Sequence, residues 1–167
     1  IITTAITGTA AVGIGGETTC SACGLRKSYA NLERSDEFEN SIMVIVDEVS
    51  FMNETDFNNL SQNLNILCDA NESKDKFGNL QVLLAGDFTQ LPPPKAPPVF
   101  NCKNLDLWEN HVNTYLPLSS NHRFKDDENW GEILSKFRND GPSEENVHFI
   151  NSKVIDDGTK IPDNATY

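Results

Sequence analysis

The feature that most constrains the fold is a pair of uninterrupted apolar runs. Residues 41–46 read Ser-Ile-Met-Val-Ile-Val, and residues 80–85 read Leu-Gln-Val-Leu-Leu-Ala. Such runs are typical of strands that are buried on both faces of a sheet. Between them, apolar residues recur with helical spacing from Phe57 to Leu67, and Asn53 stands where an N-cap is expected. Buried strands separated by a helix predict an α/β fold with a parallel sheet flanked by helices.

The rest of the chain predicts further elements of the same fold. Residues 1–6 favour a short strand, and residues 112–116 favour a third core strand. An apolar stripe from Trp130 to Phe137 predicts an amphipathic helix whose core face includes Trp130. Residues 91–98 contain too many prolines for a helix or a central strand, so we expect a stiff loop at the rim of the sheet.

Charge and length narrow the class of protein. The chain has 167 residues, with 13 Lys and Arg against 25 Asp and Glu, for a net charge of −12. This balance argues against a broad basic face for duplex DNA, but it allows a narrow strand channel built from hydroxyls, amides and a few cations. The chain begins without Met or a signal peptide, so we expect a fragment of an intracellular protein.

The cysteine pattern favours packed thiols over a metal or redox site. Cys20 and Cys23 form a C-x-x-C pair, while Cys68 and Cys102 stand alone. A structural zinc site needs four ligands, and neither a second pair nor suitably spaced histidines are present. We therefore expect reduced cysteines that pack as small apolar residues. A redox or zinc protein is the weakest of the functional hypotheses.

Acidic residues follow both apolar runs. Asp47 and Glu48 come directly after the first run, and Asp87 follows the second. In parallel α/β sheets, ligands bind at the carboxyl ends of the strands. One carboxylate there can hold Mg²⁺ while its neighbour orients an attacking water. The sequence therefore predicts the metal-and-water half of a nucleotide site, although strand ends also carry acids for solubility alone.

The phosphate-binding half of such a site is missing from the sequence. Gly8 and Gly13 have the glycine spacing of a P-loop, but no Lys follows Gly13. Nothing in that segment can therefore reach the β- and γ-phosphates, and we expect no phosphate cradle there.

Four segments occur in an order and spacing that resemble known motifs. They are residues 7–11 with 15–18, residues 46–52, residues 86–93 and residues 121–124. The segments resemble motif Ia, Walker B, motif III and motif IV of the petite-integration-frequency (Pif) family of superfamily-one DNA helicases, whose relatives include RecD-type and transposon helicases. The resemblance implies a RecA-like P-loop NTPase domain over residues 1–150, without its first strand and P-loop helix. Residues 151–167 would then lead toward a second RecA-like domain.

The resemblance also implies roles at the nucleotide. Asp47 would hold magnesium, Glu48 would polarise the hydrolytic water, and Asp87 would help to bind the nucleotide. Gln90 would sense the γ-phosphate. Arg123 would place its guanidinium on the transferring phosphate, although a surface ion pair with a neighbouring acid is the alternative for that residue.

Three residues would contact the backbone of single-stranded DNA by the same resemblance: Thr7, Gly8 and Ser21. Small residues and hydroxyls can approach phosphates without adding positive charge. Cys20 stands where the family usually has His, which puts strand contact at that point in doubt. Trp108 could stack on a base, or it could pack in the protein.

The implied function is that of a fragment of an ATP-dependent 5′→3′ DNA helicase. Such an enzyme uses ATP and Mg²⁺ to move along single-stranded DNA and to unwind forks. DNA repair, recombination and telomere maintenance are the expected roles, in the nucleus, the mitochondrion or a bacterial cytoplasm. The 167 residues alone should be nearly inactive, because half of the nucleotide cleft is missing. The alternative is a non-catalytic RecA-like module that binds other proteins.

Overall fold

A computed structural model describes residues 1–27, 31–70, 76–100, 106–118 and 122–154. The chain divides into two compact units, Ile1–Tyr115 and Leu116–Tyr167. Each unit is described by itself. In the part of the chain that is described, no helix is both long and apolar enough to span a bilayer.

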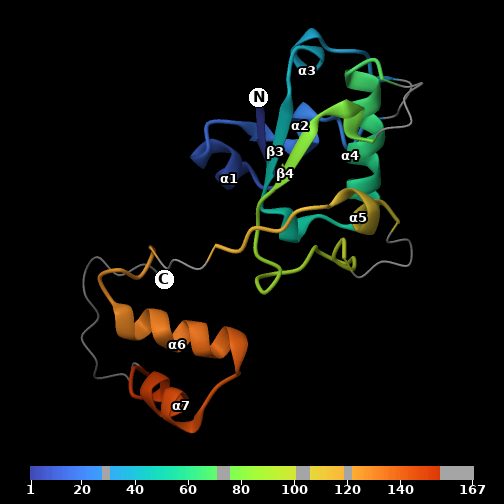
Figure 1. Ribbon diagram of the computed structural model, residues 1–167. Coiled ribbons are helices and arrows are strands. Elements are labelled where there is room, and N and C mark those ends of the chain that lie inside the picture. The colour runs from blue at the N-terminus through green and yellow to red at the C-terminus, as the bar shows by residue number, and fades with distance from the viewer. Residues whose placement is uncertain (28–30, 71–75, 101–105, 119–121, 155–167) are drawn as a thin grey trace. The chain divides into compact units, whose positions relative to one another are not determined.

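The first unit is built on a parallel sheet of four strands. In spatial order they are β2 (Glu17–Thr18), β1 (Ile2–Ala5), β3 (Met43–Asp47) and β4 (Gln81–Leu84), and every neighbouring pair is parallel. All four strands therefore end at the same edge of the sheet (Figure 1). The predicted parallel α/β fold is confirmed.

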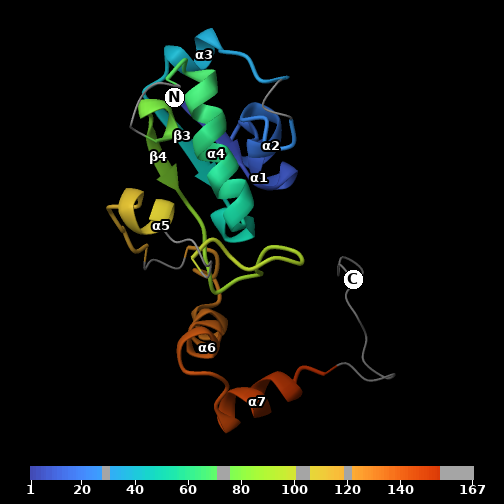
Figure 2. The same ribbon diagram turned by 90° about the vertical axis from the view of Figure 1, so that its right-hand side faces the viewer.

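Short helices follow the strands, and one long helix covers a face of the sheet. The helices of this unit are α1 (Gly8–Gly13), α2 (Thr19–Ala22), α3 (Asp36–Glu39), α4 (Glu54–Leu67) and α5 (Asp106–His111). Figure 2 shows α4 running alongside β3 and β4. Leu60 and Leu64 of α4 are fully buried, as are Val44 and Val46 of β3. The predicted N-cap is confirmed, since the Asn53 side chain accepts a hydrogen bond from the Asp56 amide at 3.0 Å.

The second unit contains two helices, α6 (Glu128–Asn139) and α7 (Glu144–Asn151). Both begin with side-chain caps, from Asp127 and Ser143 respectively. Ile133 is buried, and the ring of Trp130 lies 6.5 Å from that of Phe149. The predicted helix is confirmed as α6, and Trp130 on its apolar stripe is half-buried.

The predicted strand at residues 112–116 is wrong. This segment has no regular structure, and Tyr115 and Leu116 are 84% and 78% exposed. In the described part of the chain no strand lies beside it, so its apolar side chains have no sheet to join.

The second apolar run is less buried than predicted. It forms β4, but Leu83 is 45% exposed, whereas β3 is covered by strands on both sides. Leu83 lies on the same face of the sheet as Ile45, which is half-buried, so this face is less covered than the one with Val44 and Val46. The proline-rich loop behaves as expected, since residues 91–98 contain no helix or strand beyond one bridge between Pro98 and Asn53.

Candidate functional site

Backbone hydrogen bonds bring three loops together at the carboxyl edge of the sheet. The Ile6 amide donates to the Asp47 carbonyl at 3.0 Å, and the Ala85 amide donates to the Val46 carbonyl at 2.9 Å. The Val49 amide then donates to the Ala85 carbonyl at 2.9 Å. The segments after β1, β3 and β4 therefore leave the sheet as neighbours, and each carries residues that the sequence singled out.

The first two acids form a sharp turn at the end of β3. Glu48 adopts a left-handed conformation, with φ 57° and ψ 39°, and its amide donates to Asp47 Oδ1 at 2.9 Å. Non-glycine residues rarely adopt this conformation, and they retain it where the surroundings enforce it. Both side chains are half-buried. Among the described residues the Glu48 carboxylate has no hydrogen bond or ion pair, so its oxygens remain available to a water molecule.

Gly86 lets the loop after β4 pack directly on this turn. A Cβ atom at Gly86 would lie 2.9 Å from the Val49 amide nitrogen and 3.0 Å from Val49 Cγ1. Only glycine fits without displacing the backbone. Because Gly86 has no side chain, residues 86–90 can pack closely against the turn that carries Asp47 and Glu48.

The third acid organises its own loop. Asp87 Oδ1 accepts hydrogen bonds from the Thr89 amide at 3.1 Å and from the Thr89 hydroxyl at 2.6 Å. Asp87 Oδ2 accepts from Gln90 Nε2 at 3.0 Å. The structure thus brings Asp87 and Gln90 together, and Asp87 fixes the direction of the Gln90 amide. The nucleotide-binding role of Asp87 stays a prediction.

Aromatic rings connect this loop to the core, a contact that the sequence did not reveal. The Phe88 ring lies 4.8 Å from Phe100 and 5.8 Å from Trp108, and Trp108 lies 5.5 Å from Phe57. Trp108 is half-buried between the loop and α4. The spacing of Trp108 from the other aromatic residues in the sequence shows no periodicity. Its packing partners could therefore be found only from the structure.

The predicted strand-contact residues lie after β1 and β2. Thr7 is the N-cap of α1, where its hydroxyl accepts from the Ala10 amide at 3.3 Å, and Gly8 is exposed as the first residue of that helix. Ser21 is exposed in α2, with its hydroxyl 3.4 Å from Glu17 Oε2. Gly8 and Gly13 are both helical, so the glycine spacing forms no phosphate-binding loop, in agreement with the sequence.

The last predicted site residue lies in the other unit. Arg123 is exposed in a turn before α6, and Asn121, of the same motif, lies outside the described residues. Within the described ranges Arg123 makes no ion pair, so the pairing with Asp126 or Asp127 is not observed. Because Arg123 belongs to the second unit, its role toward the residues of the first unit stays a prediction.

The three described cysteines are free and differ in exposure. Cys23 is buried and Cys68 is half-buried, as expected, but Cys20 is exposed, so the prediction of packing is wrong for that residue. Burial raises the pKa of the Cys23 thiol to about 12, and burial likewise raises the pKa of Cys68. Both thiols are therefore protonated and unreactive at neutral pH. No cluster of metal-binding side chains occurs in the described ranges, and Cys102 lies outside them.

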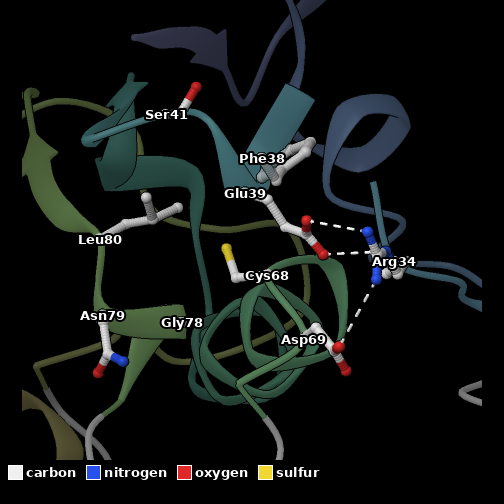
Figure 3. A pocket seen from close by; sticks show the side chains of 9 residues that line it. All are labelled: Arg34, Phe38, Glu39, Ser41, Cys68, Asp69, Gly78, Asn79 and Leu80. Carbon is white, nitrogen blue, oxygen red and sulfur yellow. Dashed lines mark hydrogen bonds and ion pairs between the residues drawn. The ribbon is translucent and has the colours of Figure 1, made fainter. Parts of the chain in front are cut away.

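A cavity of about 470 Å³ lies away from these loops, next to the residues that precede β3 and β4 (Figure 3). Its main charged group is Arg34, which pairs with Glu39 at 3.0 Å and with Asp69 at 3.9 Å. The guanidinium is thus already neutralised by the protein's own acids. This cavity and the strand-end residues are separate features.

Comparison with known proteins points to one family. The family model described as PIF1-like helicase matches residues 1–139. The chain is 33% identical over 104 residues to ATP-dependent DNA helicase Pif1 of Psychrobacter sp. (strain PRwf-1), covering 56% of this chain and 15% of that protein. It is 29% identical over 153 residues to ATP-dependent DNA helicase PIF1 of Saccharomyces cerevisiae (strain YJM789), covering 83% of this chain and 17% of that protein. The chain thus spans about a sixth of the length of these relatives.

Solved structures share the fold. The Pif1 helicase from Candida albicans superposes with a TM-score of 0.72 at 24% identity, over 89% of this chain and 36% of that one. Bacteroides Pif1 bound to single-stranded DNA gives a TM-score of 0.70 at 22% identity, over 90% of this chain and 39% of that one. The RecA-like fold expected from the motifs is confirmed.

Proposed function

The chain belongs to the PIF1-like helicase family, and from this premise we propose that it forms the hydrolytic half of the nucleotide site of an ATP-dependent DNA helicase. One observation carries the proposal. The turn with Asp47 and Glu48 packs through Gly86 on the loop that presents Asp87 and Gln90, all at the carboxyl edge of a parallel sheet. Nucleotides bind at this edge in α/β folds.

The donor chemistry of the turn fits magnesium and a hydrolytic water. Carboxylate oxygens suit Mg²⁺, which keeps most of its waters and takes one or two carboxylates from the protein. Asp47 would hold the ion, and the unpaired Glu48 carboxylate would accept a proton from the attacking water. The ion, when bound, supplies charge that offsets the phosphates. The Gln90 amide, aligned by Asp87, would contact the γ-phosphate, and Arg123 would stabilise the charge on the transferring group.

The proposal requires a phosphate-binding loop that these 167 residues do not contain, because no Gly-x-x-x-x-Gly-Lys occurs in them. The strand that would lead into such a loop could pair with the outer edge of β4. The outer edge of β4 has no partner strand among the described residues, and the Leu83 side chain of this strand is 45% exposed. Unpaired apolar edge strands readily accept another strand. We propose that further residues of the full protein pair there and complete the cleft.

Single-stranded DNA is the proposed substrate of the same edge. Thr7, Gly8 and Ser21 follow β1 and β2, whose ends lie beside that of β3. Hydroxyls and backbone amides can bind phosphates with little net positive charge, which is compatible with the net charge of −12. The structural neighbour from Bacteroides is itself bound to single-stranded DNA. Activity on forks, 5′→3′ polarity, a role in repair, recombination or telomere maintenance, and a place in the nucleus, mitochondrion or bacterial cytoplasm belong to the proposal.

Strand displacement tests the proposal. The full protein that contains these residues is mixed with Mg²⁺-ATP and duplexes that carry either a 5′ or a 3′ single-stranded tail. We expect unwinding of the 5′-tailed duplex only. Unwinding of the 3′-tailed duplex alone would show that the enzyme moves in the opposite direction, 3′→5′. Tight binding to proteins without ATP-dependent unwinding would favour the non-catalytic module, an alternative supported by the acidic charge and the missing phosphate loop.

A further inference from the structure

We propose that Trp108 is a positioning residue for the loop of residues 87–90, which it anchors to the core through Phe88. The structural part of this inference stands on the ring contacts alone. Its kinetic consequence rests on the proposed function, in which Gln90 of this loop contacts the γ-phosphate.

Hydrogen bonds between residues 87 and 90 fix the shape of the loop. The Gln90 amide donates to the Asp87 carbonyl at 3.0 Å, and the Gln90 side chain donates to the Asp87 carboxylate at 3.0 Å. The Thr89 amide donates to the same carboxylate at 3.1 Å. These bonds run between residues of one short segment.

The Phe88 side chain ties this segment to its surroundings. Its ring meets the edge of Trp108 at 5.8 Å and 78° and the edge of Phe100 at 4.8 Å and 76°. Phe100 is itself 42% exposed. Trp108, in contrast, packs at 5.5 Å on Phe57, which is 2% exposed in α4. Trp108 is therefore the ring through which Phe88 is connected to the buried core.

The fold places Trp108 suitably for this role. It lies in α5, which Figure 1 shows at the end of the sheet from which the loop after β4 emerges. Edge-to-face aromatic pairs stabilise a contact enough to change a local opening equilibrium about 3- to 10-fold. Loss of the indole should therefore free the loop and turn the Gln90 amide away from its working position, while the Asp47–Glu48 turn stays in place.

The test compares Trp108→Ala with Trp108→Phe in the full protein. Hydrogen–deuterium exchange at the Thr89 and Gln90 amides reads the loop directly. We expect Trp108→Ala to accelerate exchange there about 10-fold or less, without accelerating it in α4. Trp108→Phe, which keeps an aromatic ring, should restore most of the protection.

Kinetics then show whether the loop matters for hydrolysis. At saturating single-stranded DNA, Trp108→Ala should lower kcat by up to about 10-fold, because the fraction of enzyme with the loop in place falls by no more than the opening equilibrium rises. The KM for ATP should change less, since the proposed ATP contacts at the phosphate-binding loop are unaffected. A merely structural loss would lower the fraction of folded protein and would not split kcat from KM.

Phe77→Leu is the matched control. Phe77 is buried and packs on Phe57 at 5.4 Å, in the same aromatic cluster, but it has no ring contact with Phe88. We expect Phe77→Leu to slow the folding equilibration or to lower the free energy of unfolding. Hydrogen exchange at the Thr89 and Gln90 amides should stay normal. If Trp108→Ala leaves those two amides protected, or accelerates α4 equally, the inference is overturned. If wild-type protein hydrolyses no ATP but the localised exchange is observed, the proposed function fails while the anchoring role of Trp108 stands.

Discussion

At the scale of single residues, the site depends on a turn that the backbone does not adopt freely. Glu48 is left-handed, with φ 57°, and a non-glycine residue in this region costs of the order of 1–3 kcal/mol. The bond from its amide to Asp47 and the packing of Val49 on Gly86 hold it there. Strain of this kind gathers at functional sites, and here it falls on Glu48, one of the two adjacent acids that the sequence identified.

Gly86→Ala tests the contact between the two loops. The new Cβ would lie 2.9 Å from the Val49 amide nitrogen, so we expect a loss of about 1–3 kcal/mol in the free energy of unfolding, measured by urea titration. Gly13→Ala is the control, because Gly13 is helical and a Cβ there meets nothing within 4 Å. It should leave stability unchanged or raise it by up to about 1 kcal/mol. Equal stability for both variants would contradict the described packing.

The strand-end acids could be predicted from the sequence, and the aromatic anchor could not. Asp47, Glu48 and Asp87 each follow an apolar run, and parallel strands end at one edge, so their proximity follows from local pattern. The contact between Phe88 and Trp108 joins segments with no shared period. The left-handed turn at Glu48 was equally hidden, since glutamate carries no local signal for that conformation.

At the scale of elements, strong periodicity predicted the long elements correctly, and of the two short strands predicted at residues 1–6 and 112–116 only the first forms, as β1. β3, β4, α4 and α6 form where the apolar pattern placed them. Residues 112–116 resemble a strand by composition, but they stay irregular without a neighbouring strand, and all of them except Val112 are exposed. α1 arises from small residues between two glycines, where Thr7 supplies the cap that begins the helix.

Asn53→Ala tests why α4 begins where it does. The Asn53 side chain accepts from the Asp56 amide at 3.0 Å and donates to the Asp56 carboxylate at 3.0 Å. We expect its loss to lower the free energy of unfolding by about 1 kcal/mol. Gln62→Ala, on the exposed side of the same helix, should change stability by no more than about 0.5 kcal/mol. Chemical denaturation of both variants measures the difference, and a larger loss at Gln62 would show that the cap does not set the helix stability.

At the scale of the whole molecule, the chain combines a RecA-like sheet with only part of what nucleotide hydrolysis needs. The family is shown by the match over residues 1–139, and the chain spans about a sixth of its curated relatives. The half-site at the ends of β3 and β4 fits the hydrolytic task, while the open edge of β4 fits an added strand. With a net charge of −12, the proposed binding of a DNA strand would rest on hydroxyls, amides and few cations.

The most direct test of this account is the rate of ATP hydrolysis by the full protein at saturating single-stranded DNA, with Glu48→Gln compared with wild type. Gln keeps the size of the side chain but cannot accept the proton of the attacking water. The account predicts DNA-stimulated hydrolysis in the wild type, a fall of about 10²- to 10⁴-fold in kcat for Glu48→Gln, and unchanged binding of the DNA strand. Hydrolysis that is unaffected by Glu48→Gln would contradict the assignment of the turn at the end of β3 as the hydrolytic centre.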